Sequence, residues 1–175
     1  MTPSASLRDF FAGLAEYTFE SRLGVADPPL VDYLAELLDR FVRSDALYPV
    51  RSPSGGRLNQ VTSMLAEAES RVGEARRQVH RHIGDFTLFW TGVYPEALPR
   101  IKAPDNPDYL IDFCEQGKRA YHIAATIPTD RPTENQVLER LSHDFDICVY
   151  GLGEVRREWE RKGGDDTWRL IVFGG

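Results

Sequence analysis

The sequence predicts an all-α fold, a bundle of about five helices with a short extended C-terminal segment. Apolar residues recur at spacings of three and four along most of the chain. Residues that typically begin or end helices separate these apolar runs. The 175 residues are 42% hydrophobic and 27% charged, which is typical of a globular protein. We therefore expect a single helical domain over residues 1–175.

The first two helices are predicted near the N-terminus. Ser6 is expected to cap the first helix and Gly24 to end it. Its apolar stripe consists of Leu7, Phe10, Phe11, Leu14 and Tyr17. Asp27 and Pro28 are expected to begin the second helix, because a side-chain acceptor followed by proline is typical of a helix start. Its apolar positions are Leu30, Leu34, Leu37, Leu38 and Phe41.

A long apolar seam follows the loop predicted at residues 52–56. It consists of Leu58, Val61, Leu65, Ala68, Val72, Ala75, Val79, His82, Phe86, Phe89 and Val93. This pattern predicts one long helix or two helices stacked end to end. Gly84 suggests a kink within it, and Pro95 and Pro99 fit its end.

Two further helices and an extended segment complete the predicted fold. Asn106 and Pro107 are expected to start the fourth helix, and Thr133 to cap the fifth. The fourth seam contains Leu110, Phe113, Gly117, Ala120, Ala124 and Ile127, whose small residues predict a closely packed neighbour. The fifth contains Leu138, Leu141, Phe145, Cys148, Leu152, Val155 and Trp159, and Gly163-Gly164 is expected to stop it. Residues 167–173 suggest a strand or extended segment.

The net charge and the cysteine content argue against several classes of protein. The net charge of −6 argues against nucleic-acid binding, which would require a local basic patch. The two cysteines do not suggest a disulfide scaffold or a structural zinc site. We see no signal peptide and no apolar run long enough to span a bilayer, so we expect a cytoplasmic protein that does not bind membranes.

His82 is the principal candidate for chemistry, because it is the one histidine on an apolar seam. Asp85 lies three residues later on the same predicted helix face and could orient the imidazole. Such a pair could hold a metal, haem or small ligand, or act as a general base. The alternative is a core histidine whose hydrogen bonds are satisfied by Asp85 or a backbone carbonyl. The other histidines, including His80, are expected at the surface.

The segment His80-Arg81-His82-Ile83-Gly84, followed by Phe89-Trp90, Gly92 and Tyr94, resembles the proximal-histidine region of bacterial sensor globins. The resemblance implies haem as a cofactor and His80 as its ligand, whereas the apolar periodicity directs His82 inward. Phe86, Phe89 and Trp90 belong to the densest aromatic cluster in the sequence. They could form a pocket wall beside these histidines, or simply fill the core.

A local group of basic residues is predicted on the third segment. It consists of Arg71, Arg76, Arg77, His80 and Arg81. The group could dock an acidic partner or a phosphate, or it could be a solvated face that forms surface ion pairs.

The sequence favours a non-catalytic role in protein interaction or scaffolding, with self-association as one form of it. We find no coherent catalytic motif, so whether the protein is an enzyme stays open; a hydrolase using His82, Asp85 and Asp144 is one possibility. The alternative function is a small-molecule, metal or haem-binding bundle centred on His82. No cofactor is expected under the leading hypothesis.

Overall fold

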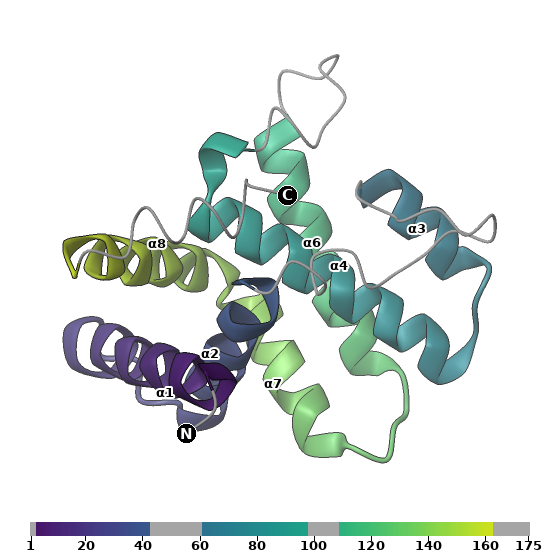
Figure 1. Ribbon diagram of the computed structural model, residues 1–175. Coiled ribbons are helices and arrows are strands. Elements are labelled where there is room, and N and C mark those ends of the chain that lie inside the picture. Colours follow the sequence, from purple (N-terminus) through teal and green to yellow (C-terminus); the bar gives the residue numbers. More distant parts are fainter. Residues whose placement is uncertain (1–2, 43–60, 98–108, 163–175) are drawn as a thin grey trace.

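The computed structural model describes residues 3–42, 61–97 and 109–162 (Figure 1). Within these ranges the chain forms seven α-helices and no strand, which confirms the all-α fold. The helices are α1 (Pro3–Ala15), α2 (Pro28–Val42), α3 (Val61–Glu69), α4 (Gly73–Val93), α6 (Tyr109–Thr126), α7 (Pro132–His143) and α8 (Phe145–Arg161). The expected loop at residues 52–56, the Asn106 cap and the C-terminal extended segment lie outside the described residues.

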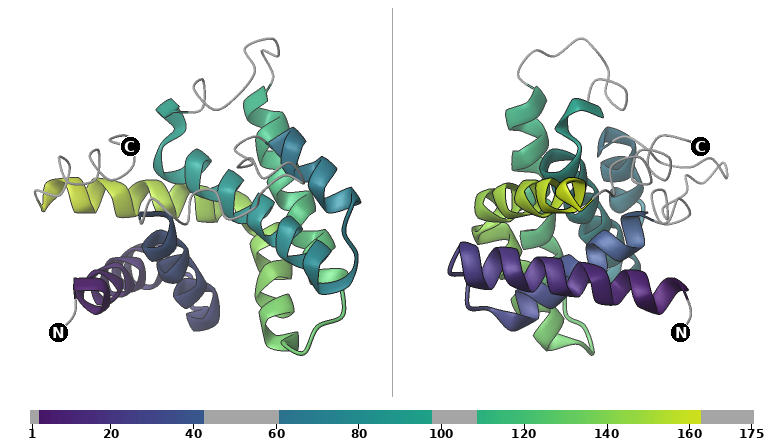
Figure 2. Two further views of the ribbon diagram at one scale, coloured as in Figure 1. Left: turned by 45° about the vertical axis from the view of Figure 1, so that its right-hand side comes forward. Right: turned by 60° about the vertical axis from the view of Figure 1, so that its left-hand side comes forward.

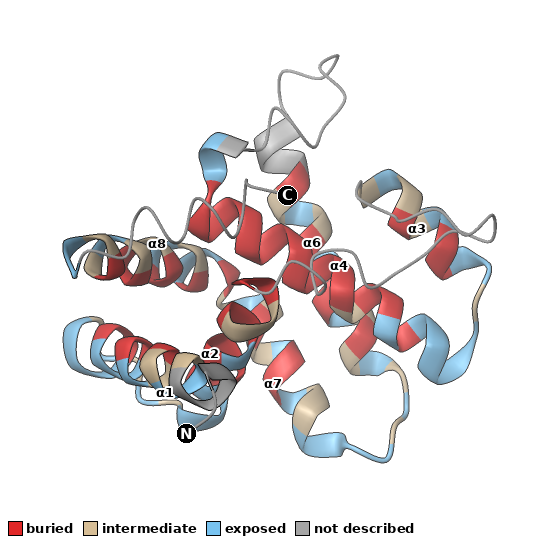
Figure 3. Cartoon of the chain, viewed as in Figure 1, coloured by how far each residue is buried: buried red, intermediate tan, exposed pale blue. Residues whose placement is uncertain are grey.

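Helix α4 is the central element of the fold. It packs against α3, α6 and α8, and also contacts α2 (Figures 1 and 2). Every residue from His82 to Val93 is buried, so this part of α4 is enclosed on all sides (Figure 3). Among the described helices, none is both long enough and apolar enough to cross a membrane. The position of α4 explains why its sequence carries the densest aromatic cluster.

The first predicted helix is divided into two parts with different geometry. The chain leaves α1 directly into a π-helix, η1, which spans Glu16–Arg22. A π-helix has more residues per turn than an α-helix, so the apolar stripe changes register at this point. Tyr17 is consequently 49% exposed, while Phe19 is fully buried. Gly24 has a φ of +70°, which fits its predicted place after the helix, but Ser6 lies within α1 and does not cap it.

The second predicted helix is confirmed at its start and along its buried face. The Leu30 backbone N–H donates to the Asp27 side chain at 3.3 Å, and α2 begins at Pro28. The apolar positions expected to face the core are all buried: Leu30, Leu34, Leu37, Leu38 and Phe41.

The continuous seam predicted from Leu58 to Val93 is interrupted in the structure. Helix α3 ends at Glu69, and α4 begins at Gly73, whose φ of +59° reverses the chain direction. The two helices pack against each other as a hairpin (Figure 2). The expectation of one long helix or an end-to-end stack is therefore wrong, and Val72 is 84% exposed. Helix α4 continues through Gly84 without interruption.

Close packing explains the small residues of α4 and α6. A Cβ atom at Gly84 would lie 2.5 Å from the ring of Tyr121, and one at Gly117 would overlap the Thr87 hydroxyl. The predicted close neighbour of α6 is therefore α4. The last predicted helix is two helices, α7 and α8, which meet at Asp144. Thr133 is not its cap, because α7 begins at Pro132.

Candidate ligand-binding site

A pocket of about 220 Å³ lies beside the middle of α4. The last turn of α2, the turn between α3 and α4, and α4 itself contribute its walls. The lining residues are Arg40, Arg71, Gln78, Val79, Arg81, His82 and Asp85. The pocket is smaller than the ~300–1,000 Å³ typical of sites for drug-sized ligands. It therefore suits a small ligand with polar groups.

Asp85 is the buried hydrogen-bonding centre of this site. Its side chain is 1% exposed. The hydroxyls of Tyr33 and Tyr121 donate to Oδ1 at 2.6 and 2.7 Å, and Arg40 donates to Oδ2 at 2.9 Å. The three donors come from α2 and α6, so one carboxylate connects both helices to α4.

The partners of Asp85 determine its charge. Burial by itself would raise the pKa of Asp85, but Arg40, Arg81 and the hydrogen bond from Tyr33 hold it below the usual value. Asp85 is therefore ionised at neutral pH. Burial and the adjacent Asp85 charge raise the pKa of Tyr33 and Tyr121, so both hydroxyls keep their protons.

His82 also lines the pocket, next to Asp85 in space but not bonded to it. Its side chain stacks on Phe41, with ring centroids 5.9 Å apart. Both ring nitrogens are buried, and no described residue forms a hydrogen bond with either. The described residues therefore contain neither the predicted His82–Asp85 hydrogen bond nor one between His82 and a backbone carbonyl. Burial lowers the pKa of His82 to about 4, so the ring is neutral at physiological pH.

The three arginines of the pocket differ in how their charges are balanced. Arg40 pairs with Asp85, and Arg71 pairs with the buried Glu67 at 2.5 Å. Arg81 instead donates to two neutral groups: the Tyr33 hydroxyl at 3.1 Å and the Gln78 amide oxygen at 3.3 Å. The carboxylate paired with it, Glu134, lies 3.7 Å away.

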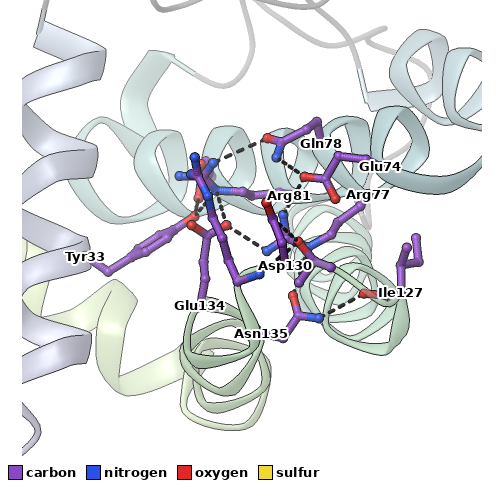
Figure 4. Close-up of polar contacts among 12 residues, drawn as sticks. Tyr33, Glu74, Arg77, Gln78, Arg81, Ile127, Asp130, Glu134 and Asn135 are labelled. Atoms are coloured by element: carbon purple, nitrogen blue, oxygen red, sulfur yellow. Dashed lines mark hydrogen bonds and ion pairs between the residues drawn. The ribbon is translucent and has the colours of Figure 1, made fainter.

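A second cluster, around the buried Arg77, joins α4 to α7 (Figure 4). Arg77 is completely buried and donates to Glu134 at 2.7 Å and to Asn135 at 2.8 Å, both on α7. Asn135 donates in turn to the Ile127 carbonyl at 2.9 Å. Arg77 also pairs with Glu74 at 3.0 Å, so Arg77 and Arg81 share two carboxylates, of which Glu134 is closer to Arg77 than to Arg81. Arg77 is therefore not part of a solvated basic face.

The structure separates the residues proposed from sequence. His82 and Asp85 line one pocket, whereas Phe86, Phe89 and Trp90 are buried in the core and do not line it. His80 was expected at the surface, but it is 4% exposed, and burial lowers its pKa to about 4. It is not one of the residues that line the pocket. Asp144 contacts the exposed His143 and belongs to neither cluster.

Sequence reasoning missed Tyr33, Arg40 and Tyr121 as residues of this site. Tyr33 and Arg40 are seven residues apart, so they share one face of α2, and this spacing was a usable signal. Tyr121 is adjacent to the predicted seam residue Ala120, and no local pattern distinguishes its hydroxyl from that of a surface tyrosine. Only the packing of α6 on α4 brings it to Asp85.

Within the described ranges, no three or more histidine, cysteine, aspartate or glutamate side chains form a group that could hold a metal ion. The polar groups that line the pocket are three guanidinium groups, an amide, an imidazole and the Asp85 carboxylate, and the guanidinium groups favour an organic or anionic ligand. Comparison with known proteins found no match for this chain among family models, curated proteins or solved structures.

Proposed function

We propose that this protein binds a small molecule in the pocket beside α4, with His82 as a central residue of the site. The observation that supports the proposal most directly is the buried His82 imidazole, whose nitrogens have no hydrogen-bond partner among the described residues. Leaving such groups unpaired costs about 1–3 kcal/mol each, and a bound ligand would recover part of this.

The pocket also supplies polar groups that could orient a ligand. Arg40 and Arg71 have side chains more than one third exposed, so a change of rotamer in either would widen the path to His82. The small volume favours a ligand smaller than haem. The protein-interaction or scaffolding role expected from the sequence stays a prediction beside this proposal.

A matched pair of variants on α4 tests the proposal. H82L and H80L each remove a buried imidazole that has no partner among the described residues, but only His82 lines the pocket. We would screen small polar fragments by saturation-transfer NMR against the wild type and both variants. We expect a fragment to bind the wild type and H80L, and to lose binding to H82L.

Folding of each variant is measured separately by urea denaturation. H82L is expected to be as stable as the wild type or more stable, because it removes unpaired buried nitrogens. Equal fragment binding to H82L and the wild type, or no fragment binding to the wild type, would overturn the proposal.

A further inference from the structure

We propose that the ligand of this pocket is a small soluble phosphate monoester, anchored through its phosphate by Arg81. This inference rests on the proposed function and specifies its ligand class. Its basis is the arrangement of guanidinium groups around the pocket, which is independent of the unpaired nitrogens of His82.

Arg81 is the strongest anion anchor in the pocket. Its guanidinium donates to two neutral acceptors, Tyr33 and Gln78, and its side chain is only 20% exposed. Glu134, at 3.7 Å, is shared with Arg77. A cation in this position gains more from a bound anion than Arg40 or Arg71, because each of those already pairs closely with a carboxylate.

The positions of the three arginines favour phosphate over carboxylate. They extend from separate segments: Arg40 from the last turn of α2, Arg71 from the turn before α4, and Arg81 from within α4. Guanidinium groups from several directions suit the three terminal oxygens of a phosphate better than the two coplanar oxygens of a carboxylate.

The remaining groups suit the organic part of such a ligand. A neutral imidazole offers one donor and one acceptor, and the Gln78 amide offers both as well. His82 and Gln78 could therefore bind the hydroxyls of a small polyol phosphate. The Asp85 carboxylate lines the pocket but is 1% exposed and accepts hydrogen bonds from Tyr33, Tyr121 and Arg40, so its charge is partly offset within the protein.

Calorimetry on the full chain tests the ligand class with four probes: glycerol 3-phosphate, inorganic phosphate, glycerol and succinate. We expect glycerol 3-phosphate to bind most tightly, inorganic phosphate more weakly, and glycerol and succinate more weakly still. R81Q should weaken glycerol 3-phosphate binding about tenfold or more, since it removes a charged hydrogen-bond donor. R76Q is the matched control on α4, because Arg76 is exposed and does not line the pocket.

A second measurement uses the wild-type protein and does not depend on the folding of R81Q. The ring signals of His82 should shift on titration with glycerol 3-phosphate, whereas those of the exposed His122 should not. R81K should retain part of the affinity, because it preserves the positive charge without the guanidinium geometry.

Several results would overturn the phosphate assignment. The first is tighter binding of succinate than of glycerol 3-phosphate. The second is equal affinity of R81Q and the wild type for glycerol 3-phosphate, and the third is a shift of the His122 ring signals with no shift of those of His82. Sedimentation with phosphatidic acid vesicles without binding of glycerol 3-phosphate would assign the site to a lipid headgroup instead, and would also overturn it. If fragments still bind in a His82-dependent way, the small-molecule function stands while the phosphate class fails; if neither binds, both fail.

Discussion

Replacing Asp85 by asparagine removes one negative charge from the point where α2, α4 and α6 meet, with little change in shape. The amide oxygen of D85N can still accept hydrogen bonds from Tyr33 and Tyr121. Its NH₂ group, however, would face the guanidinium of Arg40, which now bonds to Oδ2 at 2.9 Å. The variant therefore exchanges an ion pair for two opposed donors.

The expected loss of stability follows from the contacts of Asp85. A hydrogen bond to a charged group contributes about 1.5–3 kcal/mol and one between neutral groups about 0.5–1.5 kcal/mol, so the two tyrosine bonds together lose about 2 kcal/mol. Breaking a buried ion pair costs about 3–5 kcal/mol, but Arg40 is partly exposed and recovers solvation. The neutral side chain is also easier to bury than a carboxylate. We expect a net loss of about 2–4 kcal/mol in the free energy of unfolding.

Urea denaturation followed by circular dichroism measures this loss directly. The matched control is D146N, because Asp146 is 80% exposed and pairs with Lys118 at the surface. It should change stability by about 0.5 kcal/mol or less. A cycle that combines D85N with Y121F should show coupling, since D85N weakens the hydrogen bond that Y121F removes. A D85N protein within about 1 kcal/mol of the wild type would refute the central role of Asp85.

Three other predictions concern stability. Burial lowers the pKa of His82 from 6.5 to about 4. As the pH falls between these two values, the His82 imidazole binds a proton in the unfolded chain but stays neutral in the folded chain, so the free energy of unfolding decreases. The folded state should lose about 3 kcal/mol through this residue between pH 6.5 and 4 and none above pH 7; an H82L variant with an unchanged pH dependence in denaturation would contradict this. G84A should lose about 1–3 kcal/mol by overlap with the Tyr121 ring, whereas G13A has open space and should gain up to about 1 kcal/mol; equal melting temperatures would exclude the overlap. R77Q should lose about 3–5 kcal/mol, because it removes a fully buried guanidinium that bonds to two residues of α7, and a melting temperature equal to that of the wild type would disprove this role.

Local sequence patterns predicted the helices well where a cap or a regular seam was present. Asp27 and Pro28 located the start of α2, and its five apolar positions all face the core. Periodicity failed where backbone geometry changed without a change in composition. The π-helix after α1 moved Tyr17 to the surface, and the positive φ of Gly73 turned one predicted seam into a helical hairpin.

The site was only partly predictable, because its hydrogen bonds join residues far apart in sequence. His82 and Asp85 were found from their spacing, yet they do not bond to each other. Asp85 bonds to residues 52 and 36 positions away, and no periodic signal records such pairings. His80 was placed at the surface because it lies off the seam, but a helix enclosed on several sides has no single buried stripe.

The shared carboxylate of Asp85 also constrains the order of events during folding. Its hydrogen-bond partners on α2 and α6 are brought together only when both helices have docked on α4. Dehydrating the carboxylate before either hydroxyl arrives would be unfavourable, so the docking of the two helices is coupled in time. Contacts of Tyr33 and Tyr121 with Asp85 should therefore form after the rate-limiting barrier, with φ-values near zero and an effect chiefly on the unfolding rate. The hydrogen bonds of Asp85 would then chiefly determine the unfolding rate, and so the lifetime of the native state.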